Sequence, residues 1–252
     1  MICIYCGCNI KGKKSQEHVI PQWIIKRIGI QKYKHKFVLV SHKLNRVGER
    51  TPVTNTITHT VCSECNNGWL SDIDKSCTKA LTELIDSANI YQENLNDELN
   101  KICTLIYKIF LNFFATGPES FKKDKLHIFN EFYKHKCPPY NVELYLSKIR
   151  SDAPIRINHA DIWIHNNDNY IYKDPLGIRF KFFLQLGKIA FVLCSSGDRA
   201  KTIVYDSKYL HPLVKNPPLL TTELGLDNTP PPEFEDNLEN RILFNSLQIF
   251  EH

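Results

Sequence analysis

Four cysteines in two close pairs constrain this chain more than any other feature of its sequence. Cys3 and Cys6 form one Cys-x-x-Cys pair at the start, and Cys62 and Cys65 form another far along the chain. Four thiolates in two such pairs are the ligand set of a tetrahedral structural zinc site. A zinc ion held in this way would fasten the first residues to the segment around the second pair. The sequence therefore predicts a structural Zn²⁺ bound by Cys3, Cys6, Cys62 and Cys65.

The other cysteines bear on the cellular compartment. The chain has nine cysteines, and in a reducing compartment those outside the two pairs behave as small apolar residues. Cys8 is the exception, because it lies near Cys6 and could compete with it for zinc. The first residues lack the basic segment and long apolar core of a signal peptide, and no run of about 18 apolar residues predicts a membrane span. We therefore expect a cytoplasmic protein with no membrane partner.

A Glu-His pair between the two cysteine pairs offers a different chemistry. Glu17 and His18 stand in the segment Ser-Gln-Glu-His-Val-Ile-Pro. An imidazole has an ordinary pKa near neutrality, so His18 can take a proton from water. The Glu17 carboxylate is a hard oxygen ligand that suits Mg²⁺ or Mn²⁺. The pair thus has the parts of a hydrolytic site, although His18 could also be a buried polar residue or a further zinc ligand.

Basic residues surround this pair. The whole chain carries a formal net charge of +5, which by itself separates few classes of protein. Residues 11–50 hold eleven lysines and arginines but only two acids, Glu17 and Glu49. Such a local excess suits a polyanion, so we expect a nucleic-acid partner. Lys13 and Lys14 could bind phosphate there or lie in a solvated loop.

The hydrophobic pattern predicts an α+β fold. Helical spacing favours helices at residues 21–28, 69–88, 99–114, 121–134 and, near the end, 236–249. Runs of β-branched and aromatic residues favour strands at residues 37–40, 53–61, 142–146, 161–164, 170–172, 178–186 and 188–193. The second half should therefore be mainly antiparallel sheet. The chain of 252 residues is long enough for two units, which we place at 1–90 and 91–252.

The motifs together resemble the HNH nuclease family, whose active unit is the ββα-metal fold. The resemblance rests on four elements in order: the first Cys-x-x-Cys, Glu-His-Val-Ile-Pro, the second Cys-x-x-Cys, and the Asn-Asn-Gly-Trp that follows it. They are similar to the branch of the family in which two cysteine pairs bind a structural zinc. The resemblance covers residues 1 to about 85. It implies an N-terminal ββα-metal unit with nuclease activity, and the helices and sheet that the hydrophobic pattern predicts after it would form an accessory unit.

The resemblance implies a role for single residues. Glu17 would bind a catalytic Mg²⁺ or Mn²⁺, and His18 would be the general base. Asn66 would orient His18, with Asn67 as the alternative for that role.

One part of the family's pattern is missing from this chain. In the family, a last metal ligand comes from the first turns of the helix, usually as His or Asn. This chain has acidic residues there instead. We choose Asp74 as the ligand, because a carboxylate also suits Mg²⁺. Asp72 is the alternative, or it could be a solvated helix residue.

The predicted function is that of a metal-dependent endonuclease that hydrolyses phosphodiester bonds in nucleic acid. The family favours DNA over RNA, and similar proteins often occur in bacterial phage-defence or mobile-element systems. Residues 91–252 could bind a protein partner or form a homo-oligomer. The alternative is a non-catalytic zinc ribbon that binds nucleic acid or protein. In that case the loss of Glu17 or His18 would leave the biological activity unchanged.

Overall fold

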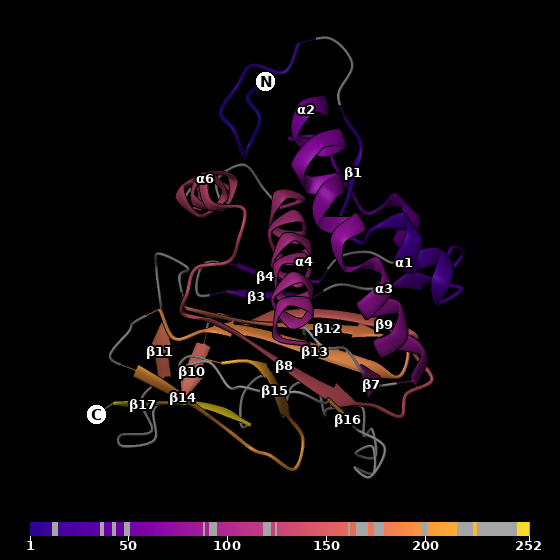
Figure 1. The fold of residues 1–252 in the computed structure, drawn as a ribbon. Helices are drawn as coiled ribbons and strands as arrows, with labels where there is room; N and C mark the ends of the chain where they lie inside the picture. The colour runs from indigo at the N-terminus through magenta and orange to yellow at the C-terminus, as the bar shows by residue number, and fades with distance from the viewer. Residues whose placement is uncertain are drawn as a thin grey trace.

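Helices and a cysteine-rich N-terminal part lie over one face of a large β-sheet, which makes the protein an α+β structure (Figure 1). This computed structural model describes residues 1–11, 15–35, 38–41, 44–47, 51–87, 89–90, 95–117, 122–123, 125–160, 162–164, 171–173, 179–197, 201–215, 224–225 and 246–251. The predicted fold class is confirmed at this level, as an α+β protein with a mainly antiparallel sheet.

The large sheet is formed mainly by strands from the second half of the chain and includes two strands from the first half. Its strands in the described residues lie in the order β15 (His211–Val214), β8 (Val142–Lys148), β13 (Ile189–Ser195), β12 (Phe180–Leu186), β9 (Ile155–Ala160), β3 (Val38–Ser41) and β4 (Leu44–Val47). Neighbouring strands run antiparallel except β3, which runs parallel to β9. Between β12 and β13, Gly187 has a φ of 65°. Glycine adopts this left-handed conformation readily, and it accounts for the turn at this position.

Both faces of the sheet are covered. β12 and β13 are buried along their whole length. Successive side chains of a strand point to opposite faces, so Phe182 belongs to the main core while Phe183 belongs to a second core. The second core includes Leu247 of β17 (Leu247–Glu251), which pairs antiparallel with β14 (Lys201–Tyr205).

One long helix, α4 (Leu95–Ala115), joins the sheet to the N-terminal part (Figure 1). Its Phe110 ring stacks on Phe180 of the sheet, with ring centroids 4.1 Å apart. On another side α4 packs against α3 (Ser71–Ser87). Two polar residues of this largely apolar helix, Lys108 and Asn112, are also buried. α4 therefore carries polar groups into the interior, between the sheet and the cysteine-rich part.

A short antiparallel pair followed by a helix forms the frame of the N-terminal part. β1 (Glu17–His18) pairs with β6 (Ile57–Thr58) and is followed by α1 (Gln22–Arg27). After β6 the chain passes through α2 (Ser63–Cys65) and η2 (Asn66–Leu70) into α3. This order places the Glu-His pair on a strand whose partner leads directly into the second cysteine pair.

The remaining short elements complete the described chain. They are η1 (Val53–Asn55), α6 (Leu126–His135), and the strand pairs β2 (Lys34–His35) with β5 (Thr51–Pro52), β7 (Asn89–Ile90) with β16 (Leu224–Gly225) and β10 (Ile162–Ile164) with β11 (Ile171–Lys173). No described helix has both the length and the apolar character needed to cross a membrane.

Most of the predicted elements are confirmed with shifted ends. The helices predicted at 21–28, 69–88, 99–114 and 121–134 correspond to α1, α3, α4 and α6. The strands predicted at 37–40, 142–146, 161–164, 170–172, 178–186 and 188–193 correspond to β3, β8, β10, β11, β12 and β13. The strands β9, β14 and β15 were not predicted, because polar residues interrupt their apolar pattern.

Two predicted elements are wrong. Residues 53–61 do not form one strand, because Val53–Asn55 turns as a 3-10 helix after Pro52 and only Ile57–Thr58 pairs. The helix predicted at 236–249 ends in a strand instead, since Leu247 and Ile249 alternate into the second core. The rest of that segment, 236–245, lies outside the described residues.

The buried core is continuous across residue 90. One cluster of buried apolar residues runs from Cys3 through Leu84 of α3 into α4 and on to Phe182 of the sheet. β3 and β4 of the first part also belong to the large sheet. The division into units 1–90 and 91–252 stays a prediction of the sequence, and the two segments share their main core.

Removal of the Phe110 ring tests how strongly the sheet holds α4. We expect Phe110→Ala to lower the free energy of unfolding by about 3–5 kcal/mol, because a buried aromatic side chain leaves a cavity when it is truncated. Urea denaturation followed by circular dichroism measures this loss. Lys101→Ala, at an exposed position of the same helix, is the control and should change the free energy by about 1 kcal/mol or less. Equal stability of the two variants would contradict the described packing.

Candidate active site and metal centre

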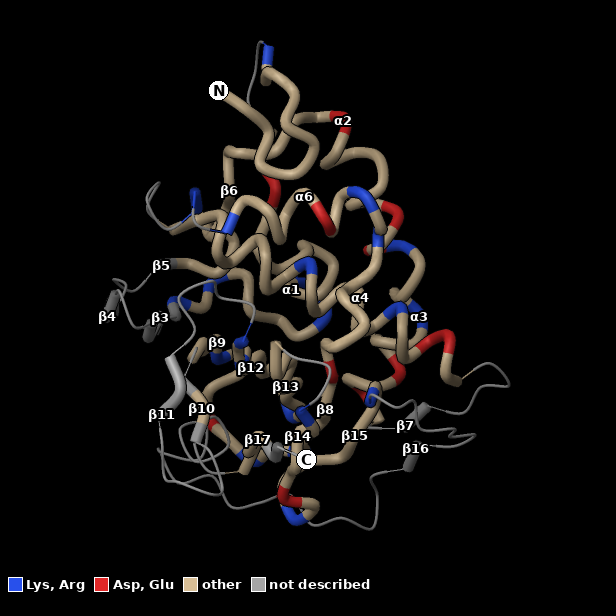
Figure 2. The backbone as a smooth tube through the Cα atoms, turned by 90° about the vertical axis from the view of Figure 1, so that its left-hand side faces the viewer, with Lys and Arg blue, Asp and Glu red and all other residues tan. Residues whose placement is uncertain are grey.

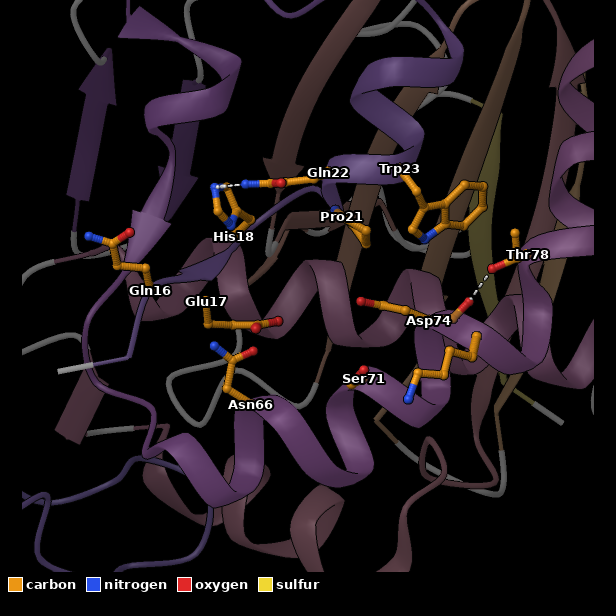
Figure 3. A pocket seen from close by; sticks show the side chains of 11 residues that line it. Gln16, Glu17, His18, Pro21, Gln22, Trp23, Asn66, Ser71, Asp74 and Thr78 are labelled. Atoms are coloured by element: carbon orange, nitrogen blue, oxygen red, sulfur yellow. Dashed lines mark hydrogen bonds between the residues drawn. The ribbon is translucent and has the colours of Figure 1, made fainter. Parts of the chain in front are cut away.

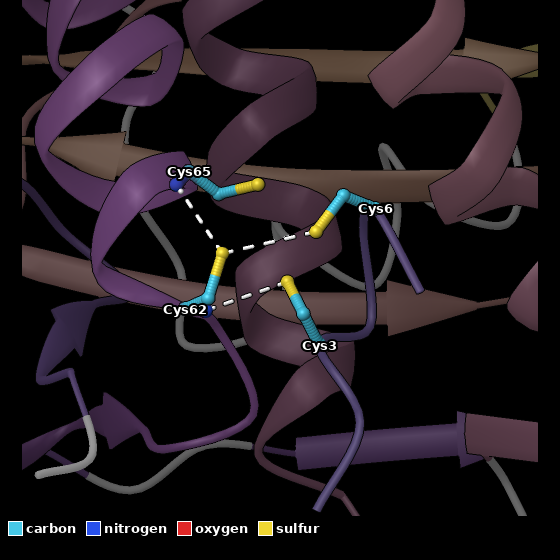
Figure 4. Close-up of side chains that lie close together, drawn as sticks. All are labelled: Cys3, Cys6, Cys62 and Cys65. Carbon is cyan, nitrogen blue, oxygen red and sulfur yellow. Dashed lines mark hydrogen bonds between the residues drawn. The ribbon is translucent and has the colours of Figure 1, made fainter. Parts of the chain in front are cut away.

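The four paired cysteines come together in the N-terminal part (Figure 4). Their sulfur atoms all lie within 4.8 Å of one another, and Cys6 Sγ is 3.7 Å from Cys62 Sγ. A tetrahedron of sulfurs around a metal ion with bonds of about 2.3 Å has edges of about 3.8 Å. Cys3, Cys62 and Cys65 are buried. The four cysteines could therefore hold a structural metal ion such as zinc, as the sequence predicts.

Hydrogen bonds link the cysteines of the cluster and affect the protonation of each thiol differently. The backbone N–H groups of Cys62 and Cys65 donate to Cys3 Sγ and Cys62 Sγ, each at 3.4 Å. The hydrogen bond from the Cys65 thiol is the main cause that lowers the pKa of Cys3, and the same bond raises the pKa of Cys65. Burial is the main cause that raises the pKa of Cys62. Metal binding requires deprotonated sulfur, so the lowered pKa of Cys3 favours its thiolate, whereas a cation would have to displace the protons of Cys62 and Cys65.

Cys8 lies beside this cluster rather than within it. Its side chain is exposed, and its Sγ atom lies 3.1 Å from Cys6 Sγ. In the described part of the chain the group with metal-site geometry consists of Cys3, Cys6, Cys62 and Cys65. Cys6 rather than Cys8 therefore completes the four.

A cavity of about 380 Å³ opens beside β1 and the first turns of α3 (Figure 3). Its lining consists of Gln16, Glu17, His18, Pro21, Gln22, Trp23, Asn66, Ser71, Asp74, Lys75 and Thr78. Figure 3 shows the side chains of Glu17 and Asp74 extending toward one another. Four of the residues selected from the sequence, Glu17, His18, Asn66 and Asp74, thus line one cavity.

Glu17 is held from its buried side by α4. Its Oε1 atom accepts a hydrogen bond from Asn112 Nδ2 at 3.0 Å and lies 3.0 Å from Lys108 Nζ. Tyr5 Oη donates to Asn112 Oδ1 at 2.7 Å and so fixes the amide. Burial raises the pKa of the Glu17 carboxyl, and the positive charge of Lys108 opposes that rise. The position of Glu17 therefore depends on α4 and on the first cysteine pair, where Tyr5 lies.

The two candidate aspartates of α3 have different surroundings. Asp74 Oδ1 lies 2.8 Å from Lys108 Nζ, and the Asp74 side chain is 23% exposed. Burial raises the pKa of the Asp74 carboxyl, against the effect of Lys108. Asp72 is 70% exposed and lies 3.5 Å from Lys75 Nζ. The structure therefore brings Asp74 to Glu17, whereas Asp72 is the solvated helix residue of the alternative reading.

His18 lies at the half-buried edge of the cavity. Gln22 Nε2 lies 3.0 Å from His18 Nε2 and donates to it. Burial lowers the pKa of His18, and the charge of Lys108 lowers it further, while a hydrogen bond to the Gln16 backbone opposes this. A lowered pKa keeps the imidazole neutral at neutral pH, the form that can accept a proton. His18 is not part of the cysteine cluster in the described residues.

The two asparagines after the second cysteine pair do not touch His18 among the hydrogen bonds of the described residues. The Asn66 amide donates to the Ser15 hydroxyl instead. Asn67 is exposed and does not line the cavity. The group next to the imidazole is Gln22, which sequence reasoning did not select. Gln22 lies at the start of α1, four residues after His18 on β1, and the turn between strand and helix brings the two side chains together.

Lys108 and Asn112 were also missed by sequence reasoning. They lie four residues apart in a helix that is otherwise strongly apolar, so they share one face of it. Lys108 is 1% exposed and Asn112 is 0% exposed. A buried lysine needs an acidic partner, and this requirement was a signal that the helix meets the Glu-His pair.

Comparison with protein-family models, with curated proteins and with solved structures finds no significant match to this chain. The chemistry of the cavity and of the cysteine cluster therefore has to be argued from their own geometry.

The cysteine cluster can be tested by its metal content. We expect Cys65→Ser to lose most of the bound zinc, because three thiolates remain where a closed structural site needs four ligands. Cys8→Ser should keep the zinc of the unchanged protein, since Cys8 lies outside the four. Mass spectrometry of the metal in protein purified without chelator measures the zinc per chain. Equal zinc loss in the two variants would mean that Cys8 is a ligand.

Proposed function

We propose that this chain is a metal-dependent endonuclease of the HNH type, which hydrolyses phosphodiester bonds in nucleic acid, with DNA as the expected substrate. One observation carries the proposal. Glu17 and His18 on β1 and Asp74 on α3 line the same cavity, beside a four-cysteine cluster that could hold a structural metal. A base, two oxygen ligands and a stabilising metal site are the parts that the sequence resemblance implies.

The order of the elements around the cavity supports the same proposal. β1 and β6 form an antiparallel pair, and the chain then enters α3 through the second cysteine pair. Two antiparallel strands followed by a helix are what a ββα-metal unit requires. In this reading the cysteine cluster clamps the start of the chain against the start of the helical segment.

The carboxylates offer oxygen atoms that fit a hydrated Mg²⁺ or Mn²⁺. Lys108 and Asn112 hold Glu17 Oε1, and Lys108 holds Asp74 Oδ1. Among the described residues, no hydrogen bond reaches the second oxygen of either carboxylate, Glu17 Oε2 or Asp74 Oδ2. Mg²⁺ is commonly bound by one or two carboxylates with waters in its other positions. Two carboxylates and one ammonium group leave a net negative charge, so the cluster still attracts a cation.

The residues around the cavity would divide the chemistry among them. His18, kept neutral by its lowered pKa, would accept a proton from the attacking water. That water would take the place of the Gln22 amide next to Nε2. An ion bound at the carboxylates would neutralise charge on the phosphate and on the leaving oxygen. Lys75 at the rim is exposed and offers a positive charge to a phosphate of the backbone.

Acidic and basic positions both occur along α3 (Figure 2), and Asp74 and Lys75 of this helix line the cavity. A nucleic acid would therefore meet basic side chains such as Lys75 close to the acidic pair. Lys13 and Lys14, which could add phosphate contacts, lie outside the described residues.

Loss of the general base tests the mechanism. We expect His18→Ala to reduce Mg²⁺-dependent nicking of plasmid DNA by about 10²- to 10⁴-fold, the usual contribution of a positioned base. Zinc content should stay unchanged, because His18 is not one of the four clustered residues, and the chain should still unfold cooperatively. Plasmid and RNA substrates, each assayed with Mg²⁺, with Mn²⁺ and with a chelator, define the substrate and the ion. Undiminished cleavage by His18→Ala would contradict the proposed mechanism.

The two aspartates of α3 form a matched pair for a second test. Asp74→Asn should lower nicking by about 10-fold or more, since even groups that only support metal ligands change activity by about 10- to 100-fold. Asp72→Asn, two residues away and solvated, should keep the activity of the unchanged protein. Initial rates at saturating Mg²⁺ measure both. A larger loss in Asp72→Asn than in Asp74→Asn would reverse the assignment of the ligand.

A further inference from the structure

The Lys108 ammonium group is surrounded by oxygen atoms at the centre of the candidate site. Its Nζ atom lies 3.0 Å from Glu17 Oε1, 2.8 Å from Asp74 Oδ1 and 3.2 Å from the Leu70 carbonyl oxygen. An ammonium group has three N–H donors and no acceptor. Each donor can therefore be matched with one of these oxygens, and the side chain is 1% exposed.

Packing alone does not account for a lysine at this position. α4 is already fixed on the sheet by apolar contacts such as that of Phe110 with Phe180. Burial of a charged group is costly unless opposite charges and hydrogen bonds compensate it. Here the compensation comes from two carboxylates that line the cavity. Without Lys108, two largely buried negative charges would face one another.

We propose that Lys108 is a positioning residue, a built-in counterion that holds Glu17 and Asp74 together as one ion-binding pair and sets how tightly that pair binds a divalent cation. The inference rests on the proposed function, because it takes these two carboxylates as the ion site. Lys108 does not act on the substrate itself. It acts through the carboxylates, from their buried side.

This role has two consequences for the pair. First, the carboxylates are held together before any ion arrives, with Asn112 fixing Glu17 from the same helix. Second, the ammonium group competes with the ion, since it already binds one oxygen of each carboxylate and repels a nearby cation. The site should therefore bind a divalent cation more weakly than two bare carboxylates in the same positions would.

Direct binding of Mn²⁺ tests this role without any need for nuclease activity. The electron paramagnetic resonance signal of free Mn²⁺, titrated with the full zinc-loaded chain, gives the dissociation constant. We expect Lys108→Met to bind Mn²⁺ about 10-fold more tightly or better, because a close positive charge is removed and methionine has a similar length. Lys101→Met, at an exposed position on the same helix, should leave the affinity unchanged.

Thermal unfolding supplies a second readout. Lys108→Met should unfold at a lower temperature than the unchanged protein when no divalent ion is added, and Mn²⁺ should restore much of the loss, because the ion replaces the missing counterion. The double variant Glu17→Gln with Lys108→Met should lose both the gain in Mn²⁺ affinity and the rescue. A Lys108→Met protein that stays unfolded with and without Mn²⁺ would contradict the proposal.

The outcomes separate this inference from the proposed function. Equal Mn²⁺ affinity in the unchanged protein and Lys108→Met, or no binding by either, would overturn the role of Lys108. A chain that cleaves nucleic acid and shows equal affinity would overturn that role alone. Tighter binding by Lys108→Met, together with no cleavage by the unchanged chain, would support the role of Lys108 and contradict the nuclease.

Discussion

Three charged side chains share one buried space between β1, α3 and α4, and this arrangement ties distant parts of the chain together. Lys108 must meet Glu17 and Asp74 because a buried charge without partners is strongly unfavourable. The hydrogen bond from Tyr5 to Asn112 extends the network to the first cysteine pair. Strand, helices and cysteine-rich turn are thereby placed relative to one another by polar contacts. Apolar burial is not directional, so by itself it would be compatible with many other arrangements of these segments.

The cysteine cluster and the sheet play complementary parts in holding that arrangement. The cluster joins the start of the chain to the segment before α3, so that Glu17 and Asp74 approach from opposite sides. The sheet fixes α4, since aromatic residues such as Phe110 lie against its buried strands. A helix anchored on one side by aromatic packing can present Lys108 and Asn112 on another side with little freedom. The accessory part of the chain therefore completes the polar interior of the N-terminal part.

Much of this architecture follows from local sequence patterns, and the rest depends on long-range contacts. Helical spacing predicted α3 and α4, and runs of β-branched and aromatic residues predicted β12 and β13, because each has a strong local signal. The cluster of the four cysteines is a long-range contact, and it was predicted because two Cys-x-x-Cys pairs are the ligand set of one zinc site. Residues 53–61 misled the prediction, since β-branched residues favour a strand while Pro52 and the short pairing with β1 decide the real structure. The role expected of Asn66 depended on side-chain directions that the sequence does not encode locally.

The polar residues of α4 show how such long-range contacts could be anticipated. An apolar helix that buries a lysine and, one turn later, an asparagine places both on one face, and neither gains from an apolar environment. Their partners must then be acidic or polar side chains of other segments. The sequence offered two such acids in separate segments, because Glu17 and Asp74 were already selected as ligands for a cation. The buried charge of Lys108 and the charges of Glu17 and Asp74 compensate one another. A prediction that considers only the acids or only the lysine therefore leaves the site incomplete.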